Sequence, residues 1–219
     1  MSSAISSSAS LHAKPQLCFN EDIKIVTFSG ISAAGKNFAA SALQHADDSI
    51  SMIRSFTTRK RRPGEQDQEY EHVHRRQFQQ MRMQFLWRIT AFQNFYGTKT
   101  SDIDEALYAE RPRVMHLVHS QVDVLQKYAS QGSCQRVFSF LVVCDDEETI
   151  VQRLRARDPG ISDNDLGLRM RDILSRQSEY RSSGRYHALI RSTDQKSRSD
   201  VFAEMMQHLS SPIPAPRKF

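Results

Sequence analysis

Apolar and polar positions alternate along this chain in blocks that predict strands separated by helices. Residues 23–29 form a largely β-branched apolar run (IKIVTFS), and residues 137–143 (VFSFLVV) are apolar at nearly every position. A strand that is covered on both faces has such a continuous run, because neither face meets water. Shorter apolar runs at 113–118 and 187–191 predict two further strands.

Segments with helical periodicity lie between and after these strands. They cover residues 37–45, 102–110, 121–129, 147–157, 165–180 and 199–209. Strands that alternate with helices favour an α/β fold with one parallel sheet and right-handed crossovers. Ligands of such a sheet collect at the carboxyl ends of its strands.

The stretch from residue 49 to residue 91 follows this alternation less regularly. Residues 49–55 predict a short strand and residues 76–82 a short helix. Residues 56–71 are polar with little periodicity, and residues 84–91 fit a helix and a strand equally well.

A glycine-bounded turn joins the first predicted strand to the first predicted helix. Its sequence, GISAAGK from Gly30 to Lys36, has the spacing of a phosphate-binding loop. Such a turn points successive backbone N–H groups at one spot, where the helix dipole and the Lys36 ammonium add positive charge. The next position normally carries a Ser or Thr that ligates Mg²⁺, and here it is Asn37. We therefore expect the loop to hold the β- and γ-phosphates of a nucleotide, with Asn37 as the candidate metal ligand.

Residues 55–65 (SFTTRKRRPGE) are a candidate for binding a second anion. Four cations occupy consecutive positions there, in a turn with hydroxyls and glycine. The planar fork of arginine can donate two parallel hydrogen bonds to a phosphate. A solvated basic loop has the same composition, so this segment by itself leaves both interpretations open.

Further arginines surround a Gly-, Pro- and Asp-rich hinge at residues 158–165 (DPGISDND). Arg153, Arg155 and Arg157 precede the hinge, and Arg169 follows it. Arginines on both sides of a hinge suit a lid that closes positive charge over a transferred phosphoryl group and excludes water. An ordinary helix–loop–helix with exposed arginines would show the same pattern.

In chain order, the phosphate loop, the SxTTRxxRxGE segment, Tyr96-Gly-Thr98 and the RLxxR run from Arg153 resemble the guanylate kinase family of P-loop nucleoside monophosphate kinases. The resemblance covers about residues 23–194. It implies a P-loop kinase core whose parallel sheet is flanked by helices, with an inserted acceptor-binding subdomain and a helical lid. It also implies an enzyme that uses ATP and Mg²⁺ to phosphorylate a phosphate-bearing small molecule, with GMP as the default acceptor of the family.

The resemblance implies boundaries and roles for individual residues. The kinase domain would span residues 21–210, with the acceptor-binding insert at 56–99 and the lid at 153–171. Positions that match the family's ATP-binding residues are Gly30, Ser32, Ala33, Ala34, Gly35, Lys36, Asn37 and Arg153. Positions that match its acceptor-binding residues are Ser55, Arg59, Arg62, Tyr70 (after a one-residue deletion), Tyr96 and Thr98. Positions that match its catalytic residues are Lys36, Arg157 and Arg169.

Three departures from the family pattern concern guanine and Mg²⁺. The family's guanine-reading glutamate falls on Trp87, and an indole cannot accept hydrogen bonds from guanine. The family's strand motif D-[IL]-D falls on His116-Leu117-Val118, so both of its carboxylates are missing. The amide oxygen of Asn37 can bind Mg²⁺, although more weakly than an anionic ligand would.

These departures leave two alternatives to a nucleoside monophosphate kinase. Ribose 1,5-bisphosphate kinases resemble guanylate kinases, carry a residue other than Ser or Thr after the loop lysine, and lack the guanine-reading acids. A guanylate-kinase-like domain can also serve as a non-catalytic module that binds a phosphorylated ligand. The retained Lys36 and lid arginines favour catalysis, whereas the missing carboxylates favour the module.

Composition limits the expected partners and location. The 219 residues carry 30 Lys and Arg against 25 Asp and Glu, a net charge of +5. No RNA-binding signature accompanies this charge, so small phosphorylated ligands are expected and nucleic acid is not. No apolar run reaches transmembrane length, so no membrane partner is expected. The three cysteines are scattered without a CxxC pair, which favours a reducing, cytoplasmic location.

Both ends of the chain differ from its body. Residues 1–20 are Ser-rich, contain no acidic residue and have few apolar residues, so a disordered leader is expected. Residues 211–219 (SPIPAPRKF) are Pro-rich and are expected to form a flexible tail.

Overall fold

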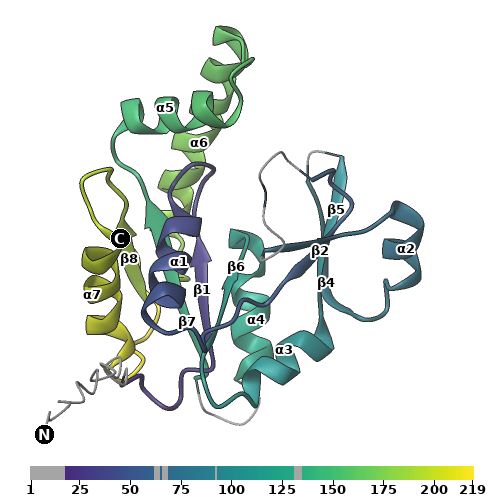
Figure 1. Cartoon of the computed structure of the whole chain (residues 1–219), viewed down its shortest axis with the longest axis vertical. Coiled ribbons are helices and arrows are strands. Elements are labelled where there is room, and N and C mark those ends of the chain that lie inside the picture. The colour runs from purple at the N-terminus through teal and green to yellow at the C-terminus, as the bar shows by residue number, and fades with distance from the viewer. Residues whose placement is uncertain (1–17, 62–64, 66–68, 92, 131–134) are drawn as a thin grey trace, which may run out of the picture.

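The computed structural model describes residues 18–61, 65, 69–91, 93–130 and 135–219. Its central sheet has the strand order β6-β1-β7-β8, and all neighbouring strands are parallel (Figure 1). The strands are β1 (Ile25–Ser29), β6 (Arg113–His116), β7 (Val137–Val143) and β8 (Ala188–Arg191). The predicted α/β class with a parallel sheet flanked by helices is confirmed.

Helices cover both faces of the central sheet. The helices of the described residues are α1 (Lys36–Ala46), α2 (Arg75–Gln80), α3 (Thr100–Leu107), α4 (Val122–Ala129), α5 (Glu147–Arg157), α6 (Asp163–Ser182) and α7 (Arg198–Leu209), with a 3₁₀ turn η1 (His119–Gln121). Of these, α2 lies on a second sheet and not on the central one. Buried residues of α1, α6 and α7 form one apolar core, and those of α3 and α4 belong to a second.

The residues of β7 alternate between these two cores. Phe138, Phe140 and Val142 enter the core of α1 and α7, while Leu141 and Val143 enter the core of α3 and α4. All positions of β7 are buried, which explains why its sequence is apolar at every position except Ser139.

A second sheet stands beside the first (Figure 1), with the strand order β3-β2-β5-β4. Its strands are β2 (Ser55–Thr57), β3 (Tyr70–His72), β4 (Phe85–Ala91) and β5 (Asn94–Lys99). β5 pairs antiparallel with β2 and β4, and β3 pairs parallel with β2. Phe56, Phe78 and Phe85 form its small core under α2.

The sequence predicted this second sheet only in part. Residues 84–91, which fitted two interpretations, contain the strand β4, and β5 was not predicted. The strand expected at 49–55 is reduced to its last residue in β2 and an isolated bridge between Met52 and Val114. Gly97 of β5 lets Phe85 approach closely, since a Cβ there would lie 3.0 Å from the Phe85 ring.

Helices α5 and α6 project beyond the carboxyl ends of the central strands, at the top of Figure 1. Asp146 caps α5 by accepting hydrogen bonds from the backbone N–H groups of Glu148 and Thr149. The acidic run at 145–148 is therefore a helix start, where negative charge is favoured by the helix dipole.

The two ends of the chain are described to different extents. Residues 1–17 of the expected leader lie outside the described residues. In the segment 211–219, expected to be a flexible tail, the N–H of Arg217 donates to the carbonyl oxygen of Tyr186 at 2.8 Å. Within the described ranges, no helix combines the length and the apolar surface needed to cross a membrane.

Candidate nucleotide and acceptor site

The loop between β1 and α1 has a backbone that two glycines make possible. Gly30 has a φ of +151°, and a Cβ there would lie 2.2 Å from the carbonyl oxygen of Val142. Gly35 has a φ of +95°, and a Cβ there would lie 2.4 Å from Oγ of Ser192. Because neither glycine has a side chain, the loop can lie directly against the carboxyl ends of β7 and β8, where a Cβ would collide.

Two predicted loop residues differ in what they can offer a nucleotide. Ala33 has a positive φ of 64°, so the turn is tight at this position. The side chain of Ala34 is buried in the core, and its N–H donates to the carbonyl oxygen of Ile31 at 3.4 Å. The N–H of Ala34 is thus already engaged within the loop.

Lys36, the first residue of α1, holds its ammonium against the loop. Nζ donates to the carbonyl oxygens of Gly30 at 3.1 Å and Ile31 at 2.8 Å. Loss of hydration lowers the pKa of Lys36 to about 8; the charge of Glu69 opposes this shift and that of Arg157 adds to it. The dipole of α1 also disfavours a cation at this helix end. A phosphate bound at the loop would offset these costs.

The ligand-free, metal-free chain should become more stable between about pH 8 and pH 10.5. Lys36 has a lower pKa in the folded chain than in the unfolded chain, so the unfolded chain binds more protons in this window and the free energy of unfolding rises with pH. We expect Lys36 to contribute a rise on the order of 2 kcal/mol, less than the full shift implies because the residue keeps some contact with water. Urea unfolding with EDTA at both pH values, compared with Lys36→Met, isolates this contribution. Identical pH dependence of the two proteins would contradict it.

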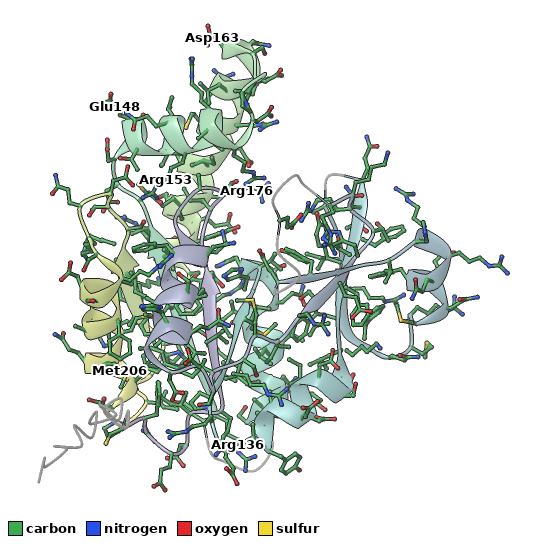
Figure 2. The ribbon with its side chains drawn as sticks, viewed as in Figure 1. Arg136, Glu148, Arg153, Asp163, Arg176 and Met206 are labelled. Atoms are coloured by element: carbon green, nitrogen blue, oxygen red, sulfur yellow. The ribbon has the colours of Figure 1, made fainter. Side chains whose placement is uncertain are left out.

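Two arginines of α5 contact the phosphate loop. Arg153 donates from Nη1 to the carbonyl oxygen of Ala33 at 3.0 Å, and Figure 2 shows it between α5 and the start of α1. Arg157 donates from Nη1 to Oγ of Ser32 at 2.9 Å. Arg169 of α6 instead pairs with an aspartate of the hinge at 3.3 Å and is 49% exposed. The structure therefore brings Arg153 and Arg157 to the loop and leaves Arg169 on α6, paired with Asp158.

Most of the predicted acceptor residues gather on the second sheet. Oγ of Ser55 and Oγ1 of Thr98 lie 2.9 Å apart. The rings of Tyr70 and Tyr96 meet edge to face with their centroids 5.9 Å apart, and the guanidinium of Arg59 lies 5.4 Å from the centroid of Tyr70. These five residues, which we call the acceptor cluster, are drawn from β2, the turn after it, β3 and β5.

The guanidinium of Arg59 already has an anionic partner in Glu65. Nη1 donates to Oε2 of Glu65 at 3.0 Å and Nη2 donates to Oε1, a bidentate pair. The hydrogen bond with Glu65 raises the pKa of Arg59 above its ordinary value. A phosphate would have to compete with Glu65 for this arginine. The other predicted arginine, Arg62, lies outside the described residues.

Glu69, which was not predicted as a site residue, connects the acceptor cluster to the phosphate loop. Its Oε1 lies 2.9 Å from Nδ1 of His116, and its Oε2 accepts a long hydrogen bond of 3.4 Å from Nδ2 of Asn37. Loss of hydration would raise the pKa of Glu69, but His116, a hydrogen bond with Tyr70 and the charge of Lys36 outweigh it and hold this pKa below its ordinary value. Only the position of Glu69 beside Tyr70 could have indicated this role from the sequence.

Two positions that match carboxylates of the family motifs hold apolar side chains here. Trp87 of β4 is 8% exposed and belongs to the same buried cluster as Ile103 and Leu107. Val118, which follows β6, is 44% exposed. Neither side chain can accept a hydrogen bond from a purine.

Asn37, exposed at the start of α1, is the residue predicted to ligate the metal. No three His, Cys, Asp or Glu side chains cluster into a metal site within the described part of the chain. In phosphoryl-transfer sites, one or two protein oxygens commonly hold Mg²⁺, and phosphates and water complete its shell. The amide of Asn37 and the carboxylate of Glu69 lie in contact and offer such oxygens, so the residues present fit Mg²⁺.

Comparison with known proteins identifies relatives that match most of the chain in sequence or in fold. No protein-family model matches the chain. The guanylate kinase of Rickettsia bellii is 29% identical over 179 residues, which cover 78% of this chain and 86% of that protein. The guanylate kinase of Paramagnetospirillum magneticum is 33% identical over 171 residues, which cover 71% of this chain and 73% of that protein. The crystal structure of guanylate kinase from Anaplasma phagocytophilum has the same fold, with a TM-score of 0.59, 16% identity, and coverage of 87% of this chain and 86% of that one. On the identity and coverage of these relatives, the chain belongs to the guanylate kinase family.

Proposed function

We propose that this chain is an ATP-dependent phosphotransferase of guanylate kinase type, which transfers the γ-phosphate of ATP to a phosphate-bearing small molecule. One observation carries the proposal: Glu69 contacts Asn37 at the phosphate loop and Tyr70 in the acceptor cluster, so the two candidate anion pockets adjoin. Adjoining pockets can hold a donor and an acceptor with their phosphates in line. Relatives named guanylate kinase give the proposal independent support.

Each pocket has a separate task in the proposed reaction. Lys36 and the loop N–H groups hold the β- and γ-phosphates, and Arg59 with Tyr70 holds the acceptor phosphate. Arg157 and Arg169 stabilise the negative charge that spreads over the transferred group. Because the attacking phosphate is already an anion, no general base is required, and catalysis consists of positioning and electrostatics. Bound Mg²⁺ would supply charge neutralisation at the β- and γ-phosphate oxygens, with Asn37 among its candidate ligands.

Two acceptors are supported by different observations. Family membership favours a nucleoside monophosphate, with GMP first. The apolar Trp87 and Val118 favour an acceptor without guanine, such as ribose 1,5-bisphosphate. Both acceptors carry a phosphate, so both would use the acceptor cluster in the same way. A cytoplasmic location, where ATP and these acceptors occur together, belongs to the same proposal.

A panel of acceptors tests the proposed reaction. We expect ADP to form from ATP with at least one of GMP, dGMP, AMP and ribose 1,5-bisphosphate, and not with guanosine, which lacks the phosphate. GMP should be preferred over AMP by less than about tenfold, because Trp87, at the position of the guanine-reading glutamate, cannot accept hydrogen bonds from guanine. The measurement is coupled ADP release with Mg²⁺ and with Mn²⁺. If no acceptor supports ADP formation but GMP still binds, the chain is a binding module instead of a kinase.

Replacing Arg59 with alanine should raise KM for the active acceptor by roughly 10- to 100-fold, the effect of losing hydrogen bonds to a charged group. KM for ATP should change little, because Arg59 belongs to the other pocket. The neighbouring exposed cation Lys60 provides the matched control, and Lys60→Ala should leave both constants within about twofold. An unchanged acceptor KM in Arg59→Ala would remove the acceptor cluster from the proposal.

A further inference from the structure

The end of β6 lacks a carboxylate that the family motif has, and another segment brings one there. The motif position is occupied by His116, whose side chain is 5% exposed. Glu69, from the segment before β3, places its Oε1 2.9 Å from Nδ1 of His116. The negative charge missing from β6 is thus supplied at the same strand end by a residue that adjoins the acceptor cluster.

We propose that Glu69 supplies the carboxylate of the Mg²⁺ site and acts there together with the amide oxygen of Asn37. This inference rests on the proposed function, since it concerns the metal that accompanies the bound nucleotide. In the family motif the carboxylates lie at the end of β6. The proposal instead takes the carboxylate from Glu69, on the acceptor side of the site.

The contacts of Glu69 include a weak one that a metal ion could replace. Oε1 lies 2.9 Å from Nδ1 of His116, whereas Oε2 accepts a long hydrogen bond of 3.4 Å from Nδ2 of Asn37. Tyr70 also forms a hydrogen bond with this carboxylate. The ring of His116 adds unsatisfied polar atoms at this place, because neither Nδ1 nor Nε2 makes a well-aligned hydrogen bond within the described part of the chain. Buried polar atoms of this kind are normally paired, so a hydrated ion or a phosphate beside them is the expected partner.

A cation beside Glu69 would be favoured by charge once a nucleotide is bound. The carboxylate of Glu69 lies close enough to the Lys36 ammonium to interact with it. The β- and γ-phosphates would bring further negative charge to the same loop, and like charges repel strongly where water is partly excluded. A divalent cation bound between Glu69 and the phosphates turns this repulsion into attraction.

This arrangement gives Glu69→Gln two effects of opposite sign. Without metal, the variant should bind ADP about threefold more tightly than the wild-type chain, because a repelling charge is gone. With ADP bound, it should bind Mn²⁺ at least about tenfold more weakly, because a metal ligand has become neutral. Isothermal titration calorimetry in EDTA measures the first affinity, and electron paramagnetic resonance of free Mn²⁺ in the presence of ADP measures the second, both with the full chain.

Glu71→Gln is the matched control. Glu71 lies two residues further along in β3, is 42% exposed and pairs with Arg54 at 3.9 Å, so its replacement should leave both affinities unchanged. A variant that merely loosens the fold would weaken ADP and Mn²⁺ binding together. If Glu69→Gln does not fold, Glu69→Asp, which keeps the charge on a shorter side chain, should weaken Mn²⁺ binding without strengthening metal-free ADP binding.

The outcomes separate this inference from the proposed function. If the wild-type chain does not bind ADP, with or without metal, both are overturned. If ADP binds and Glu69→Gln holds Mn²⁺ as tightly as the wild-type chain, only the metal assignment is overturned. Equal Mn²⁺ loss in Glu69→Gln and Glu71→Gln overturns it as well, because the effect would then reflect net charge alone.

Discussion

Replacing Lys36 with alanine should lower kcat/KM for ATP by at least ~10³-fold, because the loop lysine supplies the positive charge at the β- and γ-phosphates. The fold should survive this change. Among the described residues, the hydrogen bonds of Lys36 go to carbonyl oxygens of its own loop, and alanine is the best helix former for the first turn of α1. The melting temperature at pH 7 should stay equal or rise, since the variant no longer holds a poorly hydrated cation at a helix N-terminus. Steady-state ADP release and thermal unfolding provide the two measurements.

Lys127→Ala provides the control for the loss of one positive charge. Lys127 is exposed on α4, which covers the opposite face of the central sheet from α1, and turnover should stay within about twofold of wild type. Turnover of Lys36→Ala within tenfold of wild type would mean that the loop does not hold the reacting phosphates. A large fall in melting temperature would mean that the lysine is kept for stability.

The elements of the central sheet could be predicted from the sequence because the strongest signals for them come from short, continuous segments. The bounds predicted for β7 and α5 coincide with the observed ones. β7 is buried on both faces, and α5 begins at a side-chain cap. Both features depend on residues that are neighbours in the sequence, so the sequence alone indicates them. β5 carries no such signal, since its first three residues are only partly buried and it contains Asn94 and Gly97, which disfavour strands in isolation. Its pairing with β2 and β4 decides its conformation.

The candidate site also combines residues of one short motif with residues that are distant from each other in the sequence. The phosphate loop is one short motif, so Gly30, Gly35 and Lys36 could be identified from spacing alone, and the structure gives both glycines a steric reason. The contacts of Glu69 join a segment before β3 to the start of α1 and the end of β6, and no spacing rule links these three places. A pattern of residue types therefore identified which anions the site could hold, whereas the arrangement of charges between the two pockets required the fold.

Arg157→Ala should lower kcat by roughly 10²- to 10³-fold, the effect of removing one donor aimed at charge that develops in the transition state. The hydrogen bond from Arg157 to Ser32 joins α5 to the phosphate loop. The charge of Arg157 also lowers the pKa of Lys36, so two cations repel each other at the place where the γ-phosphate is proposed to bind. Such repulsion is tolerated where an anion arrives between the cations, and the greatest anionic charge there is that of the transferred phosphoryl group.

Arg155 is the matched control for this lid arginine. It lies on the same helix, pairs with Asp163 at 2.8 Å and is 58% exposed, so Arg155→Ala should change kcat by less than about threefold. Arg157→Ala should also raise the pKa of Lys36, followed by NMR of ¹⁵N-labelled lysine, whereas Arg155→Ala should not. The pKa measurement tests the geometry without turnover, and kcat tests the chemistry. A raised Lys36 pKa with unchanged kcat would place Arg157 beside the ligand-free loop but outside the transition state, and Arg169 would then have to leave Asp158 to supply the lid's charge.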